Sequence, residues 1–146
     1  MRRGAWLVLV LVGAGLVAAG WAVRPRAWRA NEGVNSDQVV REFAKIMSRE
    51  VGAYHRALRP IAEDAEKDSG AIAAALTAID ARAAEAITKI QQHSKNARDQ
   101  IDDMHELSLR TQDNRINRIL AQARQAERSI TQIATQARTD LQAHHH

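Results

Sequence analysis

The sequence contains no cysteine, only two prolines and few aromatic residues. The absence of cysteine excludes disulfide bonds, thiolate chemistry and metal sites with sulfur ligands. No aromatic residue follows Tyr54, and the apolar content after that point is largely alanine. Such a composition can fill a thin seam between helices but not a thick globular core. It therefore predicts an all-α protein whose helices pack through narrow apolar stripes.

Charge is distributed unevenly along the chain. The formal net charge is +4 over 146 residues, which by itself would suggest a protein that binds nucleic acid. However, residues 1–30 hold five arginines and no acidic residue, whereas the remainder carries 16 basic and 17 acidic residues. No aromatic residue accompanies the arginines of residues 110–138 to stack on bases. We therefore expect no nucleic-acid partner.

Residues 5–23 form an apolar run without a single charge. As a helix this run would be roughly 28 Å long, close to the hydrocarbon thickness of a bilayer. Trp6 near its start and Trp21, Arg24 and Trp28 at its end are residue types that favour the headgroup region. The small-residue pattern of a signal-peptide cleavage site is poor, so we expect a retained membrane anchor, with cleavage as the alternative.

The arginines that flank the apolar run nearly balance. Arg2 and Arg3 lie on one side, and Arg24, Arg26 and Arg29 lie on the other. Because a very short basic head before a first span usually stays in the cytoplasm, we expect a periplasmic body on a bacterial-type inner membrane. A cytoplasmic body is the alternative.

Glycine and proline mark the expected boundaries of the helical segments. Asn35 and Ser36 are typical of a helix N-cap, Pro60 predicts a kink or a restart, and residues 68–70 predict a break. After Gly70 the chain has neither glycine nor proline. The expected segments are a basic head at 1–4, the anchor at 5–23, a linker at 24–35, a kinked amphipathic helix at 36–69, a long alanine-rich helix at 70–143 and a tag remnant at 144–146.

Large apolar residues beyond residue 70 repeat every eleven positions. Ile79, Ile90 and Ile101 follow this spacing, as do Ile119 and Ile130. An eleven-residue repeat favours straight or slightly right-handed packing of helices. The predicted packing interface consists of Phe43, Met47, Tyr54, Leu58, Ile79, Ile90, Ile101, Ile116, Ile119, Ile130 and Ile133.

Two architectures fit residues 70–143, a helical hairpin or a continuous coiled-coil rod roughly 110 Å long. If the helix breaks, we expect the turn at residues 92–96 or 111–114. A lone alanine-rich helix buries too little area to offset the entropy lost on ordering the chain. Because residues 36–67 can cover only about half of such a rod, the stretch around Ile116, Ile119, Ile130 and Ile133 is expected to stay exposed as an assembly surface.

No residue pattern indicates catalysis or cofactor binding. His93 and His105 are twelve residues apart, a spacing that does not bring two imidazoles together on a helix. Asp102 and Asp103 are neighbours and point to different helix faces. We therefore predict a protein that is not an enzyme and has no catalytic, cofactor or metal residues.

Two families share features with this layout. The stretch ILAQARQAERSITQIATQAR at residues 119–138 resembles the rod of ATP synthase peripheral-stalk b subunits in its alanine content and eleven-residue repeat. That resemblance implies an energy-coupling stalk with a cytoplasmic rod. The plan of a short-headed anchor and a helical body is similar to inner-membrane phage spanins, which implies envelope lysis, although the cysteines common in that family are missing.

The residues themselves favour a third role, that of a structural or assembly subunit, or scaffold, of a membrane complex. Its expected partners are the lipid bilayer and either further copies of the chain or other subunits, contacted through helix packing.

Overall fold

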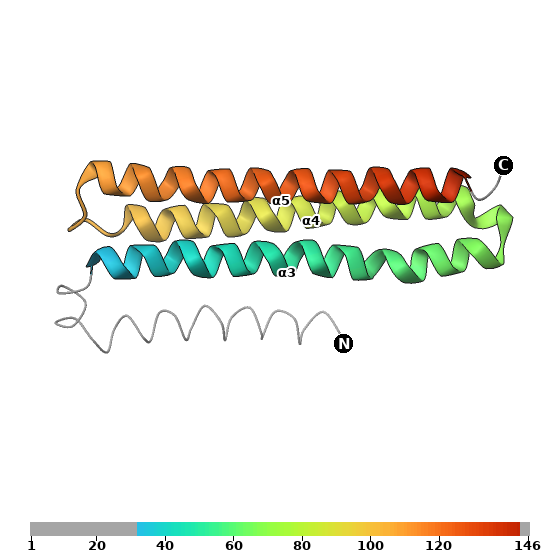
Figure 1. Ribbon diagram of the computed structural model, residues 1–146, viewed down its shortest axis with the longest axis horizontal. Coiled ribbons are helices and arrows are strands. Elements are labelled where there is room, and N and C mark those ends of the chain that lie inside the picture. The colour runs from blue at the N-terminus through green and yellow to red at the C-terminus, as the bar shows by residue number, and fades with distance from the viewer. Residues whose placement is uncertain (1–31, 144–146) are drawn as a thin grey trace. The chain divides into compact units, whose positions relative to one another are not determined.

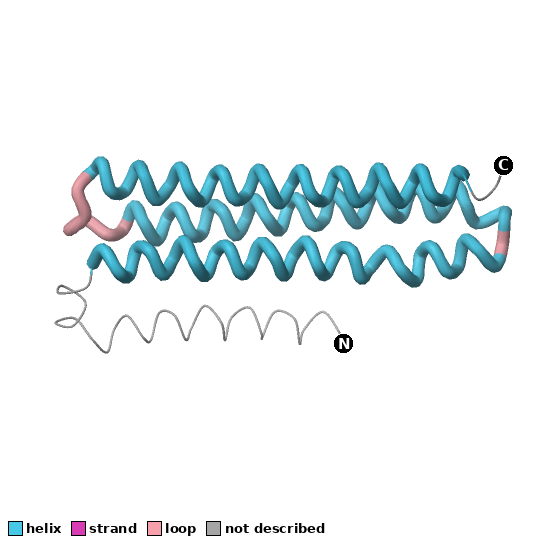
Figure 2. The backbone as a smooth tube through the Cα atoms, in the orientation of Figure 1, coloured by secondary structure: helices cyan, strands magenta, loops and turns pink. Residues whose placement is uncertain are grey.

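The computed structural model describes residues 32–143, which form three long antiparallel helices (Figures 1 and 2). Helix α3 spans Glu32–Lys67, α4 spans Ile72–Asp102 and α5 spans Leu109–Ala143, with a short 3₁₀ turn, η1, at Ser69–Ala71. From Ser36 onward the chain is one compact unit. The prediction of an all-α fold is confirmed for the described residues, which contain no strand.

Helix α3 differs from its predicted form at its start and at Pro60. It begins at Glu32, so Ser36 is not an N-cap but lies fully buried within the helix. Pro60 lies inside α3, which continues without interruption to Lys67. The predicted restart at Pro60 is therefore wrong. Because this proline is exposed, water can satisfy the carbonyl group that loses its hydrogen bond.

The break between α3 and α4 lies where the sequence predicts it. Asp68 caps the turn, since its Oδ1 accepts a hydrogen bond of 2.9 Å from the backbone N–H of Gly70. Helix α4 then begins at Ile72.

Residues 103–108 form a second turn, so a continuous helix over residues 70–143 is wrong and the hairpin is correct. Both predicted turning points, at 92–96 and 111–114, are helical. Ser108 caps α5, because its Oγ accepts a hydrogen bond of 3.2 Å from the backbone N–H of Thr111. The Gln112 side chain donates a hydrogen bond of 2.9 Å to the carbonyl oxygen of Met104, which satisfies a backbone group of the turn.

The eleven-residue repeat organises the core of all three helices. Ile79, Ile90 and Ile101 of α4 are at most 1% exposed, and Ile119 and Ile130 of α5 are fully buried. The same spacing extends to α3, where two buried series, Ser36, Met47, Leu58 and Phe43, Tyr54, Ala65, each advance by eleven residues. Three helices with the same period keep their apolar stripes in register without a strong supercoil.

Helices α4 and α5 lie closer to each other than α3 comes to either. Their backbones approach within 8 Å at many points along the hairpin. Both helices carry buried alanines, Ala75, Ala83, Ala86 and Ala97 in α4 and Ala123, Ala126 and Ala134 in α5. Helix α3 contributes larger buried side chains, Phe43, Met47, Tyr54 and Leu58. These side chains fill the space on one side of the hairpin.

The predicted interface residues mostly pack inside the single chain. All are buried except Ile116 and Ile133, which are half-buried. The expectation that Ile119 and Ile130 stay exposed is wrong, because the turn at 103–108 folds this stretch back onto α4. Ile119 and Ile130 are therefore covered within the chain itself.

Gly52 gives a simple test of how α3 is packed. A Cβ at this position would lie 3.3 Å from Nη1 of Arg56, the end of a flexible side chain that can move aside. Because glycine costs backbone entropy inside a helix, Gly52→Ala should stabilise the protein by about 0.5–1 kcal/mol. Urea unfolding of both proteins measures the change, and a lower midpoint for the variant would show that the neighbouring side chain cannot move.

Candidate functional site

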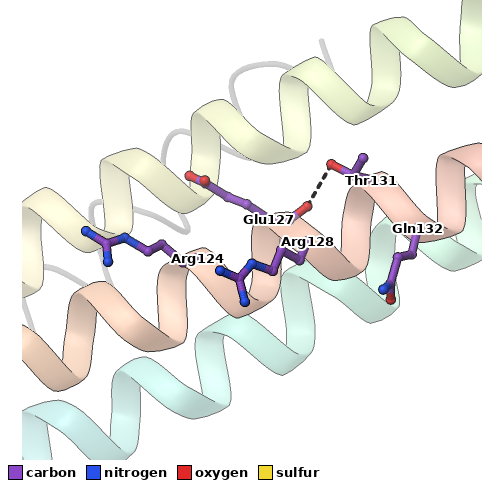
Figure 3. Close-up of a pocket in the computed structure, with 5 residues that line it drawn as sticks. All are labelled: Arg124, Glu127, Arg128, Thr131 and Gln132. Carbon is purple, nitrogen blue, oxygen red and sulfur yellow. Dashed lines mark hydrogen bonds between the residues drawn. The ribbon is translucent and has the colours of Figure 1, made fainter.

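A shallow hollow lies on the outer surface of α5, with a volume of about 380 Å³ (Figure 3). The side chains of Arg124 and Arg128 extend from the helix into solvent, while that of Glu127 reaches toward α4. The Thr131 hydroxyl donates a hydrogen bond of 3.0 Å to the backbone carbonyl of Glu127. The residues that line this hollow are Arg124, Glu127, Arg128, Thr131 and Gln132.

A second hollow, of about 200 Å³, lies between α4 and α5 and shares Arg124 and Glu127 with the first. Its walls include Arg98 and Gln91 of α4, and its floor includes Leu120 and Ala123 of α5. The Nε of Arg98 donates a hydrogen bond of 3.3 Å to the carbonyl oxygen of Ser94. We call the two adjoining hollows the arginine groove, after Arg98, Arg124 and Arg128.

The charge of the arginine groove is positive, with three guanidinium groups and one carboxylate. Neither Arg124 nor Arg128 forms an ion pair within residues 32–143. Guanidinium groups form strong paired hydrogen bonds with carboxylates, so carboxylate is the chemical group that this surface can bind. The sequence could not reveal the groove, because Arg98 joins the other two arginines only through the hairpin.

Other arginines of α5 hold the bundle together. Arg115 Nη1 lies 2.9 Å from Asp37 Oδ1, and its Nε donates a hydrogen bond of 3.2 Å to the Ser36 hydroxyl. Arg118 lies 3.6 Å from the same Asp37 oxygen. Near the opposite end of the bundle, Arg138 pairs with Asp80 of α4. These contacts fix α5 to α3 at one end and to α4 at the other.

Tyr54 also ties α3 to α4. Its hydroxyl donates a hydrogen bond of 3.2 Å to the carbonyl oxygen of Ile79. Burial, and secondarily the charge of Asp80, raises the pKa of Tyr54 above its usual value, which keeps the phenol protonated as a donor. This arrangement serves packing, since the hydroxyl group is directed to a backbone carbonyl inside the bundle.

The histidines occupy separate places in the bundle. His93 Nε2 lies 3.4 Å from Glu50 Oε1, which joins α4 to α3, while His55 and His105 are exposed. No group of three potential metal ligands occurs in the part of the chain that the structure describes.

Gln122 carries a buried side-chain oxygen, Oε1, without a hydrogen-bond partner among the described residues. An unsatisfied buried amide oxygen costs stability, so Gln122→Met should stabilise the protein by about 1 kcal/mol. The exposed Gln125 provides the matched control, because Gln125→Met changes the same atoms in solvent. Equal unfolding midpoints for the two variants would show that the Gln122 oxygen carries no penalty.

The residues predicted to anchor the chain in a membrane, Trp6, Trp21, Arg24 and Trp28, lie outside the described residues. Within residues 32–143, no helix combines the length and apolarity that crossing a bilayer requires. Comparisons with protein-family models, curated proteins and solved structures find no match to this chain.

Proposed function

We propose that this chain is a non-catalytic, single-pass membrane protein whose helical bundle serves as a structural or assembly subunit of a membrane complex. The main support is a bundle that completes its own core, with Ile90, Ile101, Ile119 and Ile130 fully buried in one chain. Helices of this length make a stiff body roughly 50 Å long. The apolar run at residues 5–23, which precedes α3, supplies the proposed anchor.

The surface that contacts the complex is, in this proposal, polar. An exposed apolar seam on α5 would have been the simplest assembly surface, but those side chains pack inside the chain. The arginine groove takes that role, because Arg124 and Arg128 are exposed in one hollow and Arg98 lines the adjoining hollow together with Arg124. An acidic segment of another subunit fits its charge.

The two family resemblances fare differently in this proposal. A peripheral stalk of the b-subunit type has less support, because residues 119–138 belong to one arm of an antiparallel hairpin. A lysis role of the spanin type stays an alternative hypothesis, which an adjacent endolysin gene would favour.

Membrane extraction tests the anchor. The full chain should stay in the membrane pellet after alkaline carbonate treatment, whereas a chain that begins at residue 32 should be released. Release of the full chain, or a mature protein that begins near Arg24, would contradict a retained anchor.

Reporter fusions after residue 143 test which side of the membrane holds the bundle. We propose an exported bundle, so a reporter that is active only outside the cytoplasm should be active. Activity of a cytoplasm-only reporter at the same position would place the bundle inside the cell.

A further inference from the structure

We propose that the turn between α4 and α5 rests on the bilayer surface, with Leu109 inserted among the lipid headgroups. This inference depends on the proposed membrane anchor and adds a second lipid contact to it. It combines the exposure of Leu109, the rigidity of the turn that presents it and the position of that turn in the bundle.

Leu109 differs from the other large apolar residues of the bundle in its exposure to solvent. Among residues 35–143 it is the large apolar side chain that stays exposed, at 78%. Single exposed apolar residues are common on protein surfaces, so exposure alone does not indicate a binding surface. In this chain, however, the other large apolar side chains are buried or half-buried, and Leu109 is not among the buried residues of the core.

The turn presents Leu109 on a fixed scaffold. Ser108, directly before it, caps α5 through the backbone N–H of Thr111 at 3.2 Å. Gln112, one turn later, is buried and bonds the carbonyl oxygen of Met104 at 2.9 Å. Met104 is itself 1% exposed. A side chain held on such a turn loses little conformational freedom when it enters a lipid surface.

Contacts between α3 and α5 place this turn at the end of the bundle where α3 begins. Arg115, in the second turn of α5, lies 2.9 Å from Asp37 and bonds Ser36, both near the start of α3 (Figure 2). Residues 24–31 separate α3 from the apolar run, and as an extended chain they reach at most about 28 Å. If the apolar run spans a bilayer, the turn therefore lies within reach of the same bilayer.

The weak membrane affinity expected from one leucine determines how the contact can be tested. Burial of a single leucine side chain is too weak to hold an untethered bundle on vesicles. A tether raises the effective concentration of the turn at the surface, so the contact should form in the full chain.

Charge around the turn restricts the contact to one edge. Asp102, Asp103 and Glu106 are exposed, as is Asp113 one helical turn after Leu109, and these carboxylates disfavour an anionic surface, whereas Arg110, beside Leu109, favours phosphate groups. The contact should therefore involve the edge formed by Leu109 and Arg110, and added anionic lipid should not strengthen it.

The experiment uses the full chain in phosphatidylcholine vesicles, with a fluorophore on a single cysteine introduced at Asp113. This exposed position lies one helical turn after Leu109, on the same face of α5. A matched probe at Ser69 reports the turn between α3 and α4, at the other end of the bundle. A lipid that carries a quencher near its headgroup should quench the probe at 113 several-fold more than the probe at 69. Leu109→Gln, an exposed change, should remove that difference while flotation with the vesicles stays complete.

Four results would overturn the inference. In protein that floats with the vesicles, equal quenching at 113 and 69, or quenching at 113 that survives Leu109→Gln, rejects the lipid contact and leaves the proposed function in place. If the emission of the probe at 113 shifts as it would in apolar surroundings but the lipid does not quench it, the turn contacts protein instead. A full chain that does not float rejects both the anchor and this inference.

Discussion

Ile119→Asp should unfold the bundle. Ile119 is fully buried in the eleven-residue stripe of α5, where a carboxylate would be removed from water. The loss of apolar burial and the cost of a buried polar group together reach on the order of 5 kcal/mol. This is comparable with the whole stability of many small domains. Circular dichroism should show a large loss of helicity or a strongly lowered melting temperature.

Asn117→Asp is the matched control, because it introduces the same carboxylate two residues earlier at an exposed position of α5. Its melting temperature should stay close to that of the parent protein. If Ile119→Asp melts like Asn117→Asp but changes the oligomeric state, Ile119 lies in a contact between chains and the intramolecular core described above is wrong.

Phe43→Ala should cost about 3–5 kcal/mol, because it leaves a cavity where the one phenylalanine of the chain is 1% exposed. The side chain lies in α3, which is held to the alanine-rich hairpin by larger side chains rather than by close backbone contact. Chemical denaturation should show a lower midpoint. A single cooperative transition is expected if α3 belongs to the same folding unit as α4 and α5.

Lys45→Ala in the same helix provides the comparison. Lys45 is exposed and pairs with Glu42 at 3.2 Å, an ion pair expected to contribute about 0–1 kcal/mol. A Phe43→Ala protein that is as stable as Lys45→Ala would mean that α3 does not pack on the hairpin as described.

Much of the core was predictable from the sequence, because the spacing of apolar residues along a helix does not depend on how the helices are arranged. The positions Ile79, Ile90 and Ile101 share one face whether the chain is a rod or a hairpin, and all three are buried. The break at Asp68 was also predictable, since glycine and a capping aspartate occur together there. Local chemistry was sufficient for both features.

The second turn was not predicted, because it contains neither glycine nor proline. Its stability comes from contacts formed by the turn itself, including the Ser108 cap and the hydrogen bond from Gln112 to Met104. A serine three residues before Thr111 is the local signal, but serine also occurs inside helices.

Because the second turn was not predicted, the arginine groove was not predicted either. On a continuous helix, Arg98 and Arg124 are far apart and the arginines form a solvated face. In the hairpin they line one groove.

Whether residues 72–143 form a hairpin or a rod can be decided by one distance. The chain has no cysteine, so spin labels can be placed on cysteines introduced at Asp80 and Arg138 alone. Because these two side chains are in contact across α4 and α5, pulsed electron paramagnetic resonance should give a distance on the order of 20 Å, set by adjacent helices and the two label arms. A continuous helix would place the labels roughly 87 Å apart, and a distance distribution with no component near 20 Å would contradict the hairpin.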